Sequence, residues 1–197
     1  MGKQKKNIEI EIRLWLKNPA PLIRWLKNNA ALLKSSKQTD IYFDPPDKSY
    51  IFIDSQDSKD ADEWFRLRTT NNENFICYKK WHRDKKTKVS LYADEIETRV
   101  VDNVNMLNIL KKIGFKETAV VKKQRKSWKF KNFEFDCDRV QKLGYFVEIE
   151  YKGKVDNLKK DKEKIFLLLE KIGIKDWRVI DRGYPWMLWN PGRTGTP

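Results

Sequence analysis

The sequence predicts an α+β protein built on a closed antiparallel β-barrel of about eight strands, with a polar tunnel inside and helices packed outside. Two observations predict this fold. Segments with the period-two alternation of strands outnumber helical segments, and in most of these strands one face is apolar while the other is charged. Surface strands usually mix Ser, Thr and Gln among their charges, whereas these faces are almost purely ionic. A barrel with charges inside and helices over its apolar outer face accounts for both.

The first half of the chain supplies most of the expected strands. Residues 8–16 alternate Ile or Leu with charged residues and are predicted as the first strand. Asn18 and Pro19 then suit the N-cap and first turn of a helix, which should continue through Leu33. Further strands are expected at 39–43, 50–53, 64–69, 75–81 and 89–101, with a polar loop at 55–62.

The second half repeats this order. Asp102 should cap a helix that Gly114 ends. After it we expect a hairpin of 120–130 and 133–137, a short helix or turn at 138–143, a strand at 145–152, a helix at 157–172 and a final short helix or loop at 178–189. The chain is therefore predicted to be one domain over 1–190, made of two similar halves with a seam near residue 102, and a flexible tail over 191–197.

Composition excludes several classes of protein. The 197 residues hold 42 Lys and Arg against 28 Asp and Glu, and the resulting charge of +14 suits a nucleic-acid binder or an enzyme for a polyanionic small molecule. Two Cys and one His speak against a disulfide framework, a zinc site and His-dependent catalysis. No stretch approaches the ~20 apolar residues of a membrane span, and no Gly-rich phosphate loop occurs. Without an apolar signal-peptide core, the predicted location is cytoplasmic.

The charged residues within the strands carry the chemical information. Residues at i and i+2 share a face, so each strand presents a small charged row. Such rows could simply meet water or form structural ion pairs. In a polar tunnel, however, the carboxylates would chelate Mg²⁺ and the Arg and Lys side chains would bind phosphate oxygens. The natural occupant is then a metal–polyphosphate complex. The rows are Glu9, Glu11 and Arg13; Arg66 and Arg68; Glu95, Glu97 and Arg99; Lys123 and Arg125; Glu148 and Glu150.

In order along the chain, these rows resemble the motifs of the CYTH superfamily, the triphosphate tunnel metalloenzymes. The resemblance runs from residue 8 to about residue 184 and is closest to the class IV adenylyl cyclase and thiamine triphosphatase branch. Its elements are Glu9-Ile-Glu11-Ile-Arg13, Tyr42-Phe43-Asp44, Arg66-Leu-Arg68, Lys79, Glu95-Ile-Glu97, Lys123-Gln-Arg125 and the run from Asp138 to Glu150. Arg13 departs from the family's lysine: it keeps the charge but cannot serve as a base.

The resemblance implies a set of site residues. Catalytic roles fall on Glu9, Glu11 and Arg13. The triphosphate would be bound by Arg66, Arg68, Lys79, Lys123 and Arg125. One or two Mg²⁺ or Mn²⁺ ions would be held by carboxylates, for which the candidates are Glu9, Glu11, Glu95, Glu97, Asp138, Glu148 and Glu150.

The activity first implied is that of a class IV adenylyl cyclase, which converts ATP into cyclic AMP and pyrophosphate. A triphosphatase acting on inorganic, thiamine or nucleoside triphosphate would use the same apparatus. Arg13 also suits a module that binds triphosphate without turnover. The basic runs 79–88 and 111–131 allow a nucleic-acid binder, although this is not favoured. The expected partner is a triphosphate substrate and not a membrane, and the chain is expected to be a monomer or homodimer.

Overall fold

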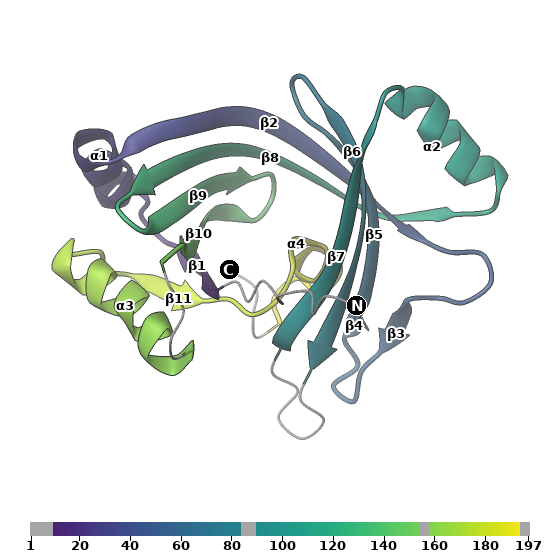
Figure 1. Ribbon diagram of the computed structural model, residues 1–197. Helices are drawn as coiled ribbons and strands as arrows, with labels where there is room; N and C mark the ends of the chain where they lie inside the picture. Colours follow the sequence, from purple (N-terminus) through teal and green to yellow (C-terminus); the bar gives the residue numbers. More distant parts are fainter. Residues whose placement is uncertain (1–9, 84–89, 154–157, 194–197) are drawn as a thin grey trace, which may run out of the picture. The chain divides into compact units, whose positions relative to one another are not determined.

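The computed structural model describes residues 10–83, 90–153 and 158–193 (Figure 1). The described part contains long β-strands and a few helices, which confirms the α+β class. In the strand order of the main sheet the outermost strands are β7 and β11, so closure into a barrel stays a prediction. None of the helices in the described ranges combines the length and the apolar character that a membrane crossing requires.

The chain is divided into two compact units, each assembled from separated segments. Unit 1 consists of Met1–Ser35, Lys126–Asp138 and Tyr145–Ile180, and unit 2 of Ser36–Arg125, Arg139–Gly144 and Asp181–Pro197. The long strands β2 (Ala31–Asp44) and β8 (Lys116–Phe130) contribute residues to both. A single domain with a seam near residue 102 stays a prediction.

The strands of unit 1 follow the order β11-β1-β10-β9-β8. The strand β1 pairs antiparallel with β10, which sets Glu11 opposite Glu150 and Arg13 opposite Glu148. On its other side β1 pairs with the short strand β11. The elements of this unit, besides its parts of β2 and β8, are β1 (Ile10–Leu16), α1 (Ala20–Asn29), β9 (Phe133–Val140), β10 (Gly144–Tyr151), α3 (Leu158–Lys171) and β11 (Trp177–Val179).

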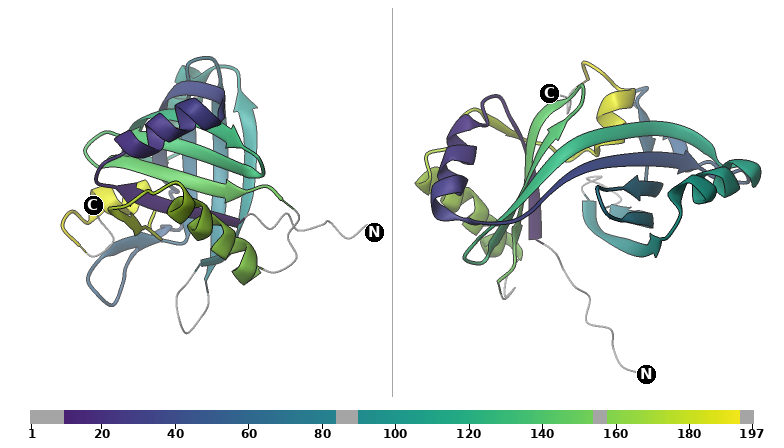
Figure 2. Two further views of the ribbon diagram at one scale, coloured as in Figure 1. Left: turned by 90° about the vertical axis from the view of Figure 1, so that its left-hand side faces the viewer. Right: turned by 90° about the horizontal axis from the view of Figure 1, so that it is seen from above.

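The apolar face of unit 1 forms its core. Helices α1 and α3 lie across this face of the sheet (Figure 2). Apolar residues of β1, β9 and β10 alternate with the charged ones, so they all reach the helices. The core includes Leu14, Leu22, Leu26, Phe135, Ile149, Ile165 and Leu169, each at most 1% exposed. One face of each strand is therefore apolar and covered, as the alternation predicts.

The strands of unit 2 follow the order β8-β2-β5-β6-β7. Antiparallel pairing sets Arg68 opposite Asp40 and Arg66 opposite Tyr42. The apolar face packs against α2, with Phe43, Leu67, Val100 and Leu110 at its centre. The remaining elements of this unit are β3 (Ile51–Ile53), β4 (Lys59–Ala61), β5 (Glu63–Thr69), β6 (Asn74–Arg83), β7 (Ser90–Val100), α2 (Asn103–Lys112) and α4 (Tyr184–Trp189).

Several element predictions are wrong at their boundaries: β2 begins at Ala31 rather than at residue 39, and β11 is a strand where a helix or loop was predicted. Helix α1 ends at Asn29 rather than continuing through Leu33, because two Asn residues disfavour helix and Ala30 is already extended. Strand β9 continues to Val140, where the sequence favoured a helix or turn. The polar loop 55–62 contains β4, whose Lys59 backbone N–H and C=O are both hydrogen-bonded by the Asn190 side chain. That partner is too distant in sequence for any local pattern to show it.

We predict that Phe135→Ala destabilises the protein by about 3–5 kcal/mol, because it empties a fully buried position in the core of unit 1. Urea unfolding followed by circular dichroism measures the effect. The control Leu167→Ala, at a 63% exposed position on α3, should change stability by less than about 0.5 kcal/mol. Similar losses for both variants would contradict this packing.

Candidate functional site

The basic residues predicted to bind triphosphate all lie in unit 2. They come from neighbouring strands: Arg66 and Arg68 from β5, Lys79 from β6, and Lys123 and Arg125 from β8. Arg66 and Lys79 share an ion-pair partner, and Arg66, Arg68 and Lys123 all act electrostatically on Asp40. The structure therefore brings at least four of these side chains to one charged face, opposite the face that packs on α2.

A buried carboxylate on β2 fixes one of these arginines. Asp40 is 1% exposed, and it accepts hydrogen bonds from Arg68 Nε at 2.6 Å and from Arg68 Nη2 at 2.8 Å. Burial by itself would raise the pKa of the Asp40 carboxyl. The hydrogen bonds and charge of Arg68, helped by Arg66 and Lys123, nevertheless hold that pKa below its ordinary value. Asp40 is thus ionised, and its two bonds lock the plane of the Arg68 guanidinium.

Tyr42 lies opposite Arg66 across the strand pair. The Tyr42 ring is buried, which raises the pKa of its hydroxyl, while the charge of Arg66 acts to lower it. Burial would lower the pKa of Arg66, but Tyr42 and Asp40 outweigh burial and raise it. Arg66 Nε has no hydrogen-bond partner among the described residues. A permanently charged guanidinium with one free N–H suits an oxyanion ligand.

The two glutamates of β7 lie among these cations. Glu95 forms an ion pair with Lys79 at 2.8 Å, and Arg66 Nη2 lies 3.7 Å from Glu95 and 3.9 Å from Glu97. Burial acts to raise the pKa of Glu95, but Lys79 and Arg66 hold it below its ordinary value. These carboxylates therefore neutralise part of the basic face.

Cys77 joins the same group. Its Sγ donates to Glu95 at 3.4 Å, and burial raises the pKa of the thiol to about 11. Among the described residues, Cys77, Glu95 and Glu97 form the one group of three whose potential ligand atoms all lie within 4.8 Å of one another. The carboxylate oxygens suit a hard cation such as Mg²⁺, whereas a protonated thiol does not.

Lys123 connects the charged face to the C-terminal helix. It is 5% exposed, and its Nζ lies 5.2 Å from the centre of the Tyr184 ring on α4. Helix α4 is held by the Asn190 bonds to Lys59 and by a hydrogen bond from Trp189 Nε1 to Thr118 O at 2.9 Å. The C-terminal segment thus positions a buried lysine of unit 2.

The remaining predicted acids lie in unit 1. Arg13 Nε donates to Glu148 at 2.8 Å, and a second bond joins the same side chains. Glu150 forms an ion pair with Lys152 at 2.6 Å. Glu11 is exposed and lies across the strand pair from Glu150, whereas Asp138 on β9 is 1% exposed. Glu9 lies outside the described residues.

These oxygen donors fit a divalent cation by their chemistry. Carboxylates are the protein ligands that Mg²⁺ and Mn²⁺ prefer. Asp138 is a carboxylate withdrawn from water, and Glu11 and Glu150 are neighbours across β1 and β10. Glu148 is bound to Arg13 and Glu150 to Lys152, so part of the charge of each is already neutralised.

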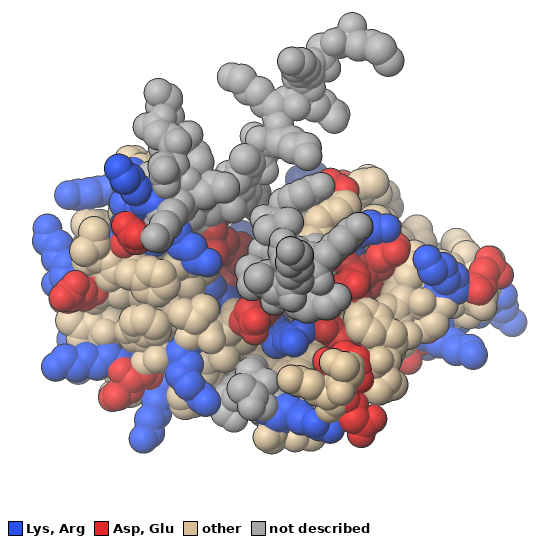
Figure 3. Space-filling model, turned by 90° about the horizontal axis from the view of Figure 1, so that it is seen from below, with Lys and Arg blue, Asp and Glu red and all other residues tan. Residues whose placement is uncertain are grey.

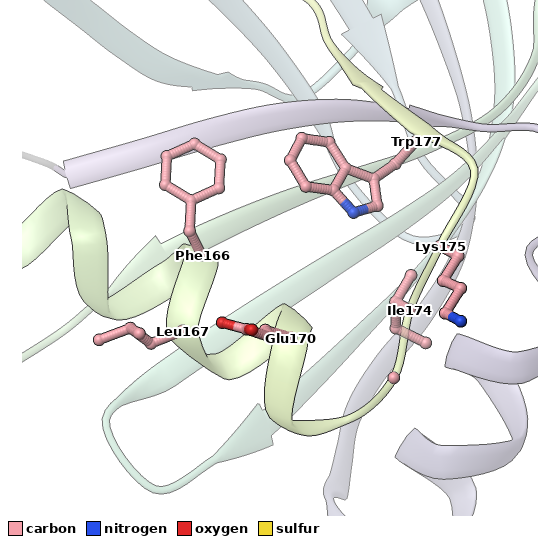
Figure 4. Close-up of a pocket in the computed structure, with 7 residues that line it drawn as sticks. Phe166, Leu167, Glu170, Ile174, Lys175 and Trp177 are labelled. Atoms are coloured by element: carbon pink, nitrogen blue, oxygen red, sulfur yellow. The ribbon is translucent and has the colours of Figure 1, made fainter.

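Two surface features lie away from these residues. A pocket of about 500 Å³ beside α3 is lined mainly by apolar side chains, among them Phe166, Ile174 and Trp177 (Figure 4). It offers one Lys and one Glu, too few charges for a polyphosphate. Elsewhere Lys and Arg side chains project around the margins of the face in Figure 3, with Asp and Glu interspersed.

Sequence reasoning missed Asp40, Gln38 and Cys77. The missed signal lies in residues 36–42, where polar residues occupy every even position up to Tyr42. Because the strand was expected to begin only at Thr39, this row was not recognised as one face. Nothing local distinguished Cys77 from an ordinary core cysteine.

Comparison with known proteins gives concordant results. The CYTH domain family model matches residues 7–184. A protein of Methanocaldococcus jannaschii, named "Putative adenylate cyclase", is 32% identical over 180 residues, which is 90% of this chain and 96% of the relative.

Two solved structures are similar. One, of a Pyrococcus horikoshii protein, has a TM-score of 0.69 at 26% identity, with 92% of this chain and 98% of the other covered. The second, from Hippeastrum, is described as an adenylyl cyclase candidate with a dominant triphosphatase activity. Its TM-score is 0.60 at 17% identity, and the match covers 90% of this chain and 93% of the other, a likeness of fold alone.

We predict that Asp40→Asn destabilises the protein by about 3–5 kcal/mol at pH 7, because it leaves the Arg68 guanidinium without its buried counter-charge. The Asp40 pKa is lowered on folding, so this stabilisation is complete above the unfolded pKa of about 3.9 and is lost as pH falls through the folded pKa. Urea unfolding at pH 7, 5 and 3 measures both effects.

The difference between wild type and Asp40→Asn should therefore be the same at pH 7 and 5 and smaller at pH 3. The matched control is Asp181→Asn, whose carboxylate is 82% exposed, and it should change stability by less than about 0.5 kcal/mol. A difference that does not shrink at pH 3 would show that the Asp40 charge is not what stabilises the fold.

Proposed function

Because this chain belongs to the CYTH family, we propose that it is a divalent-metal-dependent enzyme that converts ATP into cyclic AMP and pyrophosphate. The observation that carries the proposal is the basic face of unit 2, where Asp40 orients Arg68 beside Arg66, Lys79 and Lys123. The name of the Methanocaldococcus jannaschii relative supports the cyclase assignment. The closed barrel with a polar tunnel belongs to the same proposal.

The basic side chains bind and orient the triphosphate. Arg68 is held in one plane by Asp40, so it can donate its remaining N–H groups to phosphate oxygens without first losing conformational freedom. Arg66, Lys79, Lys123 and Arg125 add positive charge along the same substrate. Phosphoryl chemistry depends mainly on such positioning and charge neutralisation, and does not need His or Ser.

The carboxylates would hold Mg²⁺ or Mn²⁺. We assign this role to Glu11, Asp138, Glu148 and Glu150 of unit 1, with Glu9, and we keep Glu95 and Glu97 of unit 2 as further ligands. The bound ion supplies positive charge that stabilises the phosphate oxygens. The Arg13 bonds to Glu148 restrict how fully that carboxylate can serve.

In the cyclase reaction the ribose 3′-hydroxyl attacks the α-phosphorus. A new oxygen–phosphorus bond forms, the bond to the bridging oxygen breaks, and pyrophosphate leaves with that electron pair while the hydroxyl proton is lost to water. The protein must fold the ATP so that its hydroxyl reaches the α-phosphate. We assign this positioning to the cations that bind the β- and γ-phosphates.

Hydrolysis is the second candidate. The triphosphatase activity described for the Hippeastrum protein favours it, since that protein shares the fold. Against it stands Arg13, which stays protonated and is bound to Glu148, and therefore cannot take a proton from an attacking water.

We predict that wild-type protein with ATP and Mg²⁺ or Mn²⁺ forms cyclic AMP and pyrophosphate, measured by chromatography and phosphate-specific assays. Arg66→Ala should lower kcat/KM about 100-fold or more, because it removes a fixed charge from the phosphate site. The control Arg99→Ala, at a 77% exposed side chain paired with Glu73, should have little effect. ADP and phosphate as sole products would select the triphosphatase. No product from ATP, inorganic triphosphate or thiamine triphosphate would refute both.

We also predict that Arg13→Lys raises the ratio of ADP to cyclic AMP by about threefold or more. A lysine can lose its proton and then act as the base that activates a water molecule for attack. The same end-point analysis of products measures the ratio. Arg24→Lys, at an exposed position on α1, is the control. An unchanged ratio, with ATP still bound, would show that position 13 does not decide between the two reactions.

A further inference from the structure

One side chain on the charged face of β2 has incomplete hydrogen bonding. Ser36, Gln38 and Asp40 occupy alternate positions, and all three are buried. Gln38 Nε2 donates to Ser36 Oγ at 3.0 Å, but Gln38 Oε1 has no partner among the described residues. A buried amide oxygen without a donor is costly, and native proteins keep few of them. Gln38 therefore points to a group that is bound there.

This free acceptor lies next to the groups assigned to the triphosphate. Gln38 and Asp40 are two residues apart on one strand, so their side chains leave the same face about 7 Å apart. Asp40 in turn holds Arg68 and is attracted by Lys123. A ligand bound by Arg68 and Lys123 thus lies within the length of a nucleotide from Gln38.

A triphosphate chain cannot satisfy this acceptor. Once paired with Arg and Lys side chains its oxygens are deprotonated, so they accept hydrogen bonds, do not donate them, and would repel the amide oxygen of Gln38. The missing partner is therefore an N–H or O–H group or a cation, and a cation is disfavoured beside the positive charges of Arg68 and Lys123. A sugar hydroxyl and the exocyclic amine of a base both meet that requirement.

We propose that Gln38 is a specificity-determining residue, which accepts a hydrogen bond from a hydroxyl or amino group on the organic part of the substrate. The site therefore prefers a nucleotide to inorganic triphosphate. This inference rests on the proposed function and adds to it the residue that selects a nucleotide over inorganic triphosphate. Since the bond forms on binding and does not change during the reaction, Gln38 affects KM rather than kcat.

The test compares the affinities of two ligands for the wild type and for variants that lack the Gln38 amide. Calorimetry in EDTA, where no metal supports turnover, gives Kd for ATP and for inorganic triphosphate. For Gln38→Leu and Gln38→Met, Kd for ATP should rise about three- to tenfold while Kd for inorganic triphosphate changes less than twofold. With Mg²⁺, KM for ATP should rise by a similar factor at unchanged kcat. The control Thr39→Val, on the opposite face of β2, should change neither Kd.

Other outcomes overturn the inference. Equal losses for both ligands would show that the amide nitrogen faces the phosphates, since the two ends of an amide exchange by a flip. Unchanged Kd for ATP would show that water satisfies Gln38. In both cases the wild type still binds triphosphate, so the proposed function survives. Failure of the wild type to bind either ligand refutes the proposed function and this inference with it. Thermal unfolding midpoints of the Gln38 variants close to that of wild type confirm that they fold.

Discussion

The structure depends on pairing the charged side chains of its sheets, because those withdrawn from water, such as Asp40, each require a partner. An isolated buried carboxylate or guanidinium would cost more than a single domain can tolerate. Asp40 and Arg68 in unit 2, and Arg13 and Glu148 in unit 1, meet this requirement across neighbouring strands. Because a slip of one residue would move the charges to the face under the helices, the same pairs also fix the register of the strands.

The two units divide the chemistry by charge. The charged rows of unit 1 are mainly acidic, as in Glu11, Glu148 and Glu150, and those of unit 2 hold all the residues predicted to bind triphosphate, together with Glu95 and Glu97. Acids suit a divalent cation, and bases suit phosphate oxygens. The candidate residues nearly balance one another, and the net charge of +14 therefore comes from the rest of the chain. There it can raise the encounter rate with anions without shaping the reaction.

Alternation within strands allowed much of this to be predicted from the sequence. The rows of β1, β5, β7 and β10 were identified because their charges recur at every second position against Ile, Leu and Val. Asp40 and Gln38 were not predicted as site residues. Their polar row begins with Ser and Gln, directly after a segment whose sequence indicates the end of a helix. The short strand β4 was not predicted, because its hydrogen bonding depends on the side chain of Asn190, which is distant in sequence. A local sequence pattern shows which residues share a face of a strand. It cannot show a hydrogen-bond partner that lies far away in the sequence.

The bond between Asn190 and Lys59 also bears on how the protein forms during synthesis. Unit 2 needs residue 190 to complete its hairpin, and unit 1 needs residues near 180 to supply its edge strand. Neither unit is a continuous stretch that could finish folding while the ribosome is still translating the rest. Domains that are continuous in sequence can fold one after another as they emerge. Here both units reach their final form only once the residues near 180 and 190 have emerged, so some strands of the nascent chain stay unpaired until then.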